Sequence, residues 1–160
     1  MISTRPALVC LGRRFSTDLQ KHHQLLEKAY EKAPISGLFN THKISFSSEG
    51  DTTIHFTPEK KHCHTAMSLH GSGYFKMLDD AAWFSAQAQV HDNFIYTVSF
   101  NTYLQKPVPP GTALVAKGHT TFVSKNMLIA ESKLYNGETV VATGSGTFMK
   151  SPVALSDLKL

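Results

Sequence analysis

The chain has 160 residues, 41% of them hydrophobic and 18% charged, a size and balance typical of one globular domain with its own core. No run approaches the roughly 18 apolar residues of a membrane span, and two cysteines are too few for a disulfide scaffold, which indicates a reducing compartment. Residues 1–17 carry three arginines and no acidic residue, so they supply most of the net charge of +4. The small remainder gives no reason to expect nucleic acid or an anionic membrane as a partner.

The first 15 residues resemble a mitochondrial presequence. They contain Arg5, Arg13 and Arg14 together with Ser and Thr, and they lack acidic residues, which is the signature of such leaders. The run Arg13-Arg14-Phe15-Ser16 also resembles a matrix-processing site with cleavage after Phe15. We therefore expect residues 1–15 to be a presequence and the mitochondrial matrix to be the compartment. The alternatives are a cytoplasmic protein and a disordered or alternatively started N-terminus.

After the leader, the pattern predicts one helix and one hairpin. Residues 17–33 carry a modest apolar stripe at helical spacing, and Pro34 ends that pattern. Segments 43–48 and 52–57 then alternate between apolar and polar side chains. The turn residues Glu49-Gly50-Asp51 between them favour a short hairpin. A polar loop follows and extends to Ser68.

The longest apolar run predicts a buried helix over residues 71–91. Its side chains are mostly Phe, Met, Leu, Ala and Trp on nearly every face, and a helix that is apolar all round is expected to lie in a core. Asp79 sits inside this run, where a carboxylate is costly unless it is paired or hydrogen-bonded. The glycines in His70-Gly71-Ser72-Gly73 leave backbone N–H groups free at the helix start, where negative charge is stabilised. A buried acid near such a helix start is typical of a catalytic site.

The rest of the chain predicts an antiparallel meander. Four segments alternate and are separated by turn signals, of which Asn136-Gly137 is the strongest; they are residues 94–104, 112–123, 127–135 and 139–149. In the first of them Phe94, Tyr96, Val98, Phe100 and Leu104 are expected on one face. Residues 151–160 read as a frayed tail. The order predicts an α+β fold in which an antiparallel sheet of five or six strands wraps one long buried helix, with an extra N-terminal helix.

Residues 16–150 are expected to form the domain, and the pattern over most of residues 20–150 resembles the hotdog fold of the PaaI-like acyl-CoA thioesterases. Three features carry the resemblance: His70-Gly71-Ser72 with Asp79 nine residues after the histidine, Thr97-Val98-Ser99-Phe100 leading to Pro107, and the strand from Val141 to Phe148. The resemblance implies an enzyme that hydrolyses acyl-CoA to free acid and CoA. It also implies a homodimer or homotetramer, and no cofactor.

The resemblance further implies a role for individual residues. Asp79 matches the acid that acts as general base or nucleophile, and the N–H of Gly71 matches the donor to the thioester carbonyl. Thr97 matches a hydroxyl residue that orients the water. In this family the site combines the Gly71 loop of one subunit with Asp79 and Thr97 of the other. His70 is assigned to the catalytic set, where it either takes part or caps the helix.

The sequence departs from the family pattern at two positions. His64 stands where members commonly carry an asparagine as a second carbonyl donor; a histidine can also donate a hydrogen bond. Ser72 replaces the usual second glycine, although Gly73 follows it. We expect Ser72, Gly73 and Trp83 to contact the substrate.

Two other functions remain possible, and two groups of residues are interpreted as structural. The chain could be a non-hydrolytic hotdog subunit that binds acyl-CoA or acyl carrier protein, or a hydratase or dehydratase that uses Asp79 with His64 or His70. The run of His62, Cys63 and His64 has no matching second ligand cluster, so no metal is expected. Asp80 lies four residues after Lys76 and is expected to pair with it structurally.

Overall fold

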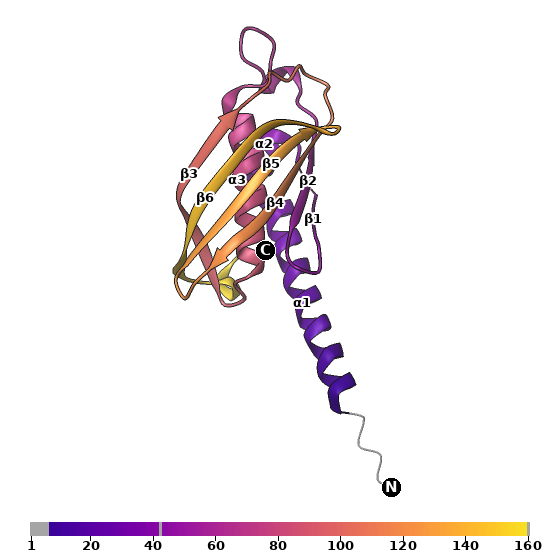
Figure 1. Cartoon of the computed structure of the whole chain (residues 1–160), viewed down its shortest axis with the longest axis vertical. Coiled ribbons are helices and arrows are strands. Elements are labelled where there is room, and N and C mark those ends of the chain that lie inside the picture. Colours follow the sequence, from indigo (N-terminus) through magenta and orange to yellow (C-terminus); the bar gives the residue numbers. More distant parts are fainter. Residues whose placement is uncertain (1–6, 42, 160) are drawn as a thin grey trace.

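The computed structural model describes residues 7–41 and 43–159, with side chains from Thr17 onward. Its elements, labelled in Figure 1, begin and end as follows: α1 Ala7–Lys32, α2 Pro34–Phe39, β1 Ile44–Phe46, β2 Thr52–Phe56, a 3-10 turn Lys60–His62, α3 Gly71–Ala88, β3 Asn93–Leu104, β4 Leu114–Val123, β5 Met127–Asn136, β6 Thr139–Ala154 and a second 3-10 turn Leu155–Asp157. No helix in the described ranges is long and apolar enough to cross a membrane.

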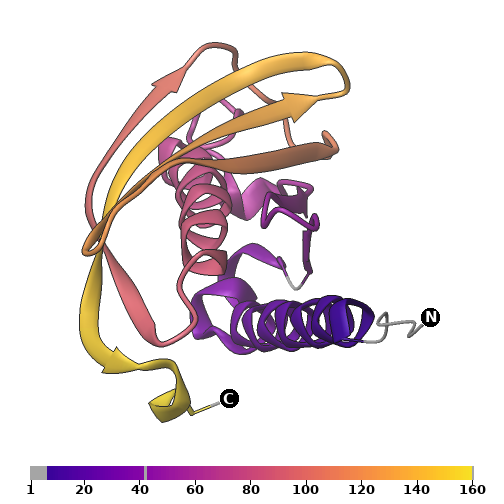
Figure 2. The same ribbon diagram turned by 60° about the horizontal axis from the view of Figure 1, so that its bottom comes forward.

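The strands that the structure describes form one six-stranded antiparallel sheet in the order β1-β2-β4-β5-β6-β3. The sheet curves around α3, and α1 lies on the open side of this arch (Figure 2). The expected α+β architecture, with one long buried helix and an N-terminal helix, is therefore confirmed. Both expected hairpins are present, with Gly50 and Gly137 at positive φ in their turns.

Helix α3 forms the centre of the core. Nine of the twelve side chains from Met77 to Ala88 are buried, because the sheet covers one side of the helix and α1 covers part of the other. Gly118 of β4 allows a close approach: a Cβ there would lie 2.0 Å from the Ala81 carbonyl oxygen. This contact holds the middle of α3, where Asp79 sits, firmly against the sheet.

Strand β3 differs from the expected alternation. The register shifts between Thr97 and Ser99, so Val98 is an extra residue and the side chains on either side of it exchange faces. Tyr96 consequently lies opposite Met149 and is exposed, whereas Phe100 lies opposite Gly146 and packs against the core. The prediction of one shared apolar face was wrong, because a bulge cannot be read from spacing.

Both ends of the chain carry more regular structure than expected. Helix α1 begins at Ala7 rather than near Thr17, and a short helix α2 starts at Pro34, a position that proline tolerates as the first helical residue. Strand β6 continues to Ala154, and the buried Leu155 donates its N–H to the Asp92 carbonyl. The prediction of a frayed tail over residues 151–160 was therefore wrong for the first of these residues.

The leader remains a prediction. Residues 1–6 lie outside the described residues, and of residues 7–16 only the helical backbone is described.

Candidate active site

The start of α3 presents a free backbone donor. His70 is the N-cap: its Nδ1 accepts the Ser72 N–H at 3.2 Å and lies 2.8 Å from the Ser72 hydroxyl. Gly71 is the first helical residue, and its N–H has no hydrogen-bond partner within the described part of the chain, as expected in a first helical turn. The end of the helix therefore offers an N–H, reinforced by the helix dipole, to a carbonyl oxygen that gains negative charge.

Gly71 and His64 line the same pocket, of about 240 Å³. Its remaining walls come from the loop after β3 and from α3, where the Tyr74 hydroxyl donates to the Lys106 carbonyl at 2.9 Å. His64 Nδ1 accepts the Ala66 N–H at 3.2 Å, so the neutral imidazole carries its proton on Nε2 and keeps that donor available. The structure thus brings together the two residues that the sequence assigned to the thioester carbonyl.

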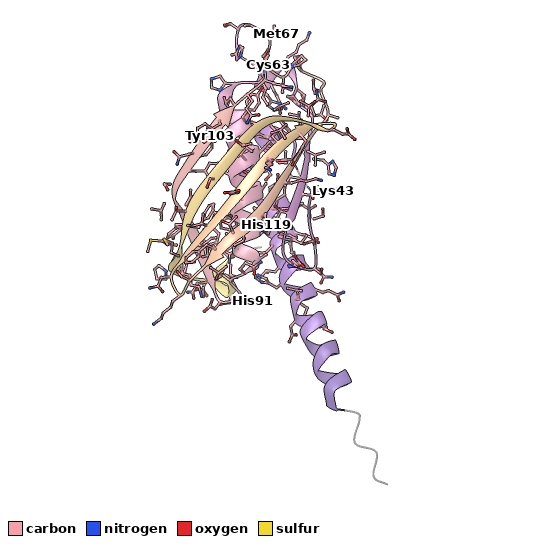
Figure 3. The ribbon with its side chains drawn as sticks, viewed as in Figure 1. Lys43, Cys63, Met67, His91, Tyr103 and His119 are labelled. Carbon is pink, nitrogen blue, oxygen red and sulfur yellow. The ribbon has the colours of Figure 1, made fainter. Side chains whose placement is uncertain are left out.

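Three other expected site residues lie elsewhere. His70 and Ser72 line a different pocket, of about 460 Å³, together with Cys63, whose loop is labelled in Figure 3. Gly73 is buried, and a Cβ there would lie 2.5 Å from Leu69 Cδ1, so this glycine serves packing. Within this chain these residues do not share the pocket of Gly71, and their expected contact with substrate stays a prediction.

Asp79 lies in the middle of α3 on the side that faces β3. Thr97 donates its hydroxyl to Asp79 Oδ1 at 3.4 Å, a long hydrogen bond. The pKa of Asp79 is raised from 3.8 to about 6: burial is the main cause and the neighbouring Asp80 adds to it, while Thr97 and Lys76 partly oppose the rise. A carboxylate with this pKa is ionised at neutral pH and is also a competent proton acceptor.

Aromatic residues lie one helical turn before and one helical turn after Asp79. Phe75 precedes Asp79 by one turn and contacts Phe100 edge to face, at 5.5 Å between ring centres. Trp83 follows Asp79 by one turn, donates its indole N–H to the Ile95 carbonyl at 3.1 Å and packs on Phe94. Asp79 therefore lies on a largely apolar surface, which suits a hydrophobic substrate group.

The two halves of the site are far apart within one chain. Asp79 lies eight positions after Gly71, which is about 12 Å along the helix axis at about 1.5 Å per residue. A water positioned by Asp79 cannot attack a carbonyl held at the Gly71 N–H of the same helix, because the attacking and reacting atoms must lie about 3 Å apart. Within one chain these two groups are therefore too far apart to act on the same carbonyl.

Sequence reasoning missed several residues around the site. Leu104 and Gln105 line the pocket with Gly71, although only the structure shows that the end of β3 returns to the start of α3. Tyr30 of α1 covers the buried pair Lys76–Asp80. Among the residues that the structure describes, no group of three or more His, Cys, Asp or Glu side chains could hold a metal ion.

Comparisons with known proteins agree with this architecture. Residues 67–143 match the family model of the thioesterase superfamily. No curated protein sequence matches the chain. The structure resembles the Escherichia coli PaaI protein of the phenylacetic acid degradation operon, with 16% identity over 87% of this chain and 97% of that chain and a TM-score of 0.76.

Two further solved structures show the same fold. A phenylacetic acid degradation-related protein of Ralstonia eutropha JMP134 is 17% identical over 80% of this chain and 98% of its own, with a TM-score of 0.71. A thioesterase family protein of Silicibacter pomeroyi is 16% identical over 80% and 96%, with a TM-score of 0.72. Such identities establish the fold. The resemblance drawn from the sequence is confirmed: the chain has the hotdog fold, and residues 67–143 match the thioesterase superfamily.

Proposed function

We propose that this protein is an acyl-CoA thioesterase in which Asp79 is the general base or the nucleophile and the Gly71 N–H binds the oxyanion. The observation that carries the proposal is the Asp79 carboxylate itself. It is half-buried on α3 between Phe75 and Trp83, its pKa is raised to about 6, and the nearby cation Lys76 forms an ion pair with Asp80 instead. An unpaired carboxylate of this kind is destabilising, which is typical of a catalytic group.

The complete site is proposed to lie between two copies of the chain. Two subunits would place the Gly71 N–H of one beside the Asp79 carboxylate of the other, which removes the separation of about 12 Å within one helix. Strand β3 offers the surface for this pairing, because it is an edge strand and carries exposed apolar side chains. Tyr103, labelled in Figure 3, is 67% exposed. A long, apolar, exposed edge favours pairing with another strand.

The proposed reaction uses these groups in turn. The thioester carbonyl accepts the Gly71 N–H, with His64 Nε2 as a second donor, while Thr97 and Asp79 hold a water molecule. Asp79 accepts a proton as the water oxygen bonds to the carbonyl carbon, and the negative charge on the carbonyl oxygen is stabilised at the helix start. The C–S bond breaks with its electrons on sulfur, and the thiolate takes the proton from Asp79. Free acid and CoA leave.

The substrate is proposed to be a CoA ester of a hydrophobic acyl group. Phe75 and Trp83 flank Asp79 on α3, and Phe100 lies beside Phe75. These side chains would contact the acyl portion next to the reacting carbon, where a charged group would lose hydration without a partner.

Release of free thiol from an acyl-CoA panel tests the function. The panel runs from acetyl to palmitoyl and includes one arylacetyl ester, and the Asp79→Asn variant is assayed beside the wild type. We expect turnover in the wild type and a loss of about 10²–10⁴-fold in the variant, the usual contribution of a general base. Asp92→Asn is the matched control, because Asp92 is an exposed loop carboxylate.

The same assay distinguishes hydrolysis from the main alternative, which is binding of acyl-CoA without hydrolysis. Wild-type protein that binds acyl-CoA but releases no thiol would instead be the non-hydrolytic binding subunit. Unchanged turnover in Asp79→Asn would remove Asp79 from the mechanism.

We also propose the mitochondrial matrix as the compartment, on the basis of the acid-free leader with three arginines. Import of the full chain into isolated mitochondria, with shortening after Phe15, is the expected result. A chain that stays outside at full length would contradict it.

A further inference from the structure

The side of α3 that faces away from β3 carries a buried ion pair. Lys76 and Asp80 are one turn apart, their charged groups are in contact, and their side chains are only 11% and 15% exposed. Tyr30 of α1, which is 1% exposed, covers them: the Lys76 ammonium lies 5.3 Å from the centre of its ring. The Tyr30 hydroxyl interacts with the Asp80 carboxylate.

Burying this ion pair between α3 and α1 has a high cost in free energy. Removing two charges from water costs several kcal/mol per ion, and apolar side chains of similar size are often as stable or more so. The cluster also leaves polar atoms poorly satisfied, because the buried Tyr30 and Thr41 hydroxyls form no hydrogen bond of normal geometry among the described residues. Stability alone therefore does not account for these side chains.

Their position next to Asp79 gives them a second effect. Asp80 is the following residue, so its side chain leaves the helix about 100° away, toward α1 rather than β3. The groups that act on Asp79 are Asp80 and Lys76 from α3 itself and the Thr97 hydroxyl from β3. Those that act on Asp80 are Lys76 from α3 and Tyr30 from α1. Through Asp80, α1 is thus connected electrostatically to Asp79.

We propose that Lys76 and Asp80, held beneath Tyr30, are positioning residues that set the charge state of the Asp79 carboxylate. Helix α1 then contributes to the reaction without touching the substrate. The inference rests on the proposed function, since it assigns these residues to the chemistry of Asp79. The Asp80 carboxylate opposes ionisation of Asp79, and the Lys76 ammonium favours it.

The test is the pH dependence of kcat/KM for thioester hydrolysis by the full chain. Asp80→Asn removes the opposing charge, so the midpoint of the acid limb should fall by about 0.5–1 pH unit. Asp80→Glu keeps the charge and should restore the wild-type midpoint. Tyr30→Phe removes a hydroxyl that favours ionised Asp80, and should lower the midpoint by less than Asp80→Asn does.

A purely structural cluster would behave differently. It would lower kcat at every pH and leave the midpoint in place, and that result would overturn the inference. An unchanged midpoint in Tyr30→Phe would show that α1 does not affect the charge state of Asp79. Should Asp80→Asn fail to fold because Lys76 is left unpaired, Lys76→Met/Asp80→Asn removes both charges; its midpoint should also fall, by less, and no change would count against the inference.

Carbon-13 NMR of the Asp79 carboxyl group in protein without substrate separates this inference from the proposed function. If the wild-type chain hydrolyses no thioester, the function fails, yet the Asp79 titration still tests the cluster. A midpoint that falls in Asp80→Asn and returns in Asp80→Glu supports the inference. Identical titrations in all three proteins contradict it.

Discussion

Asp79 and Asp80 are neighbours in the sequence, and they lie on two faces of one helix. The face toward β3 gives Asp79 a single long hydrogen bond and aromatic neighbours. The face toward α1 gives Asp80 a direct ion pair with Lys76. Burial raises the pKa of both carboxyl groups, but only Asp80 has a cation of its own. Under the proposed function, the partner rather than depth in the core separates the structural acid from the proposed catalytic one.

Among the changes that leave Asp79 itself in place, the largest expected effect lies at the start of the same helix. Gly71→Pro removes the N–H assigned to the oxyanion, and kcat should fall about 10²–10³-fold. Proline is tolerated as the first helical residue, and His70 already has the extended backbone that precedes proline readily. Gly71→Ala is the control: it keeps the N–H, and its Cβ would meet only Leu104 Cδ1 at 3.7 Å. Equal losses in both variants would contradict the role of the N–H.

The two aspartates should respond oppositely in stability. Asp80→Asn leaves the Lys76 ammonium without its partner in a largely buried position, and we expect a loss of about 3–5 kcal/mol in denaturant unfolding at pH 7.5. Asp79→Asn should instead stabilise the fold by about 1–3 kcal/mol. Equal signs in the two variants would remove the contrast between the faces.

The gain in Asp79→Asn should depend on pH with a defined sign. The pKa of Asp79 rises from 3.8 to about 6 on folding, so its contribution to stability is present at low pH and lost as the pH rises through about 6. The variant should therefore match the wild type below pH 4 and exceed it above pH 7. Unfolding curves at the two pH values measure this directly.

Activity should follow the same titration. Because only ionised Asp79 accepts a proton, kcat/KM should fall about tenfold per pH unit below a midpoint near 6. A rate that stays level down to pH 4.5, in protein shown to remain folded, would exclude Asp79 as the base.

The smallest expected effect concerns Thr97. Its hydroxyl makes a long hydrogen bond to Asp79, so Thr97→Val should lower kcat about three- to tenfold, while Thr97→Ser should retain most of it. An unchanged kcat in Thr97→Val would exclude a catalytic role for the Thr97 hydroxyl.

The sequence was sufficient to predict features that local chemistry determines. The Asn136-Gly137 hairpin, the buried α3 with Asp79 inside it, and the pairing of Lys76 with Asp80 each follow from spacing and residue type. The bulge at Val98 does not, because it depends on how β3 pairs with β6. The position of Tyr30 over the Lys76–Asp80 pair could not be predicted either, because it depends on the packing of α1 against α3, and Tyr30 and Asp80 are 50 residues apart in the sequence. The separation of Gly71 from Ser72 into two pockets likewise needed the folded loop.

Subunit complementation tests the central claim, that each site joins the helix start of one chain to the carboxylate of another. Gly71→Pro and Asp79→Asn chains are each expected to be nearly inactive, and they are mixed under conditions that exchange subunits. A mixed dimer then holds one intact site and one doubly altered site, so random exchange should restore about a quarter of the wild-type activity. No recovery, with mixed dimers present, would contradict the two-chain site.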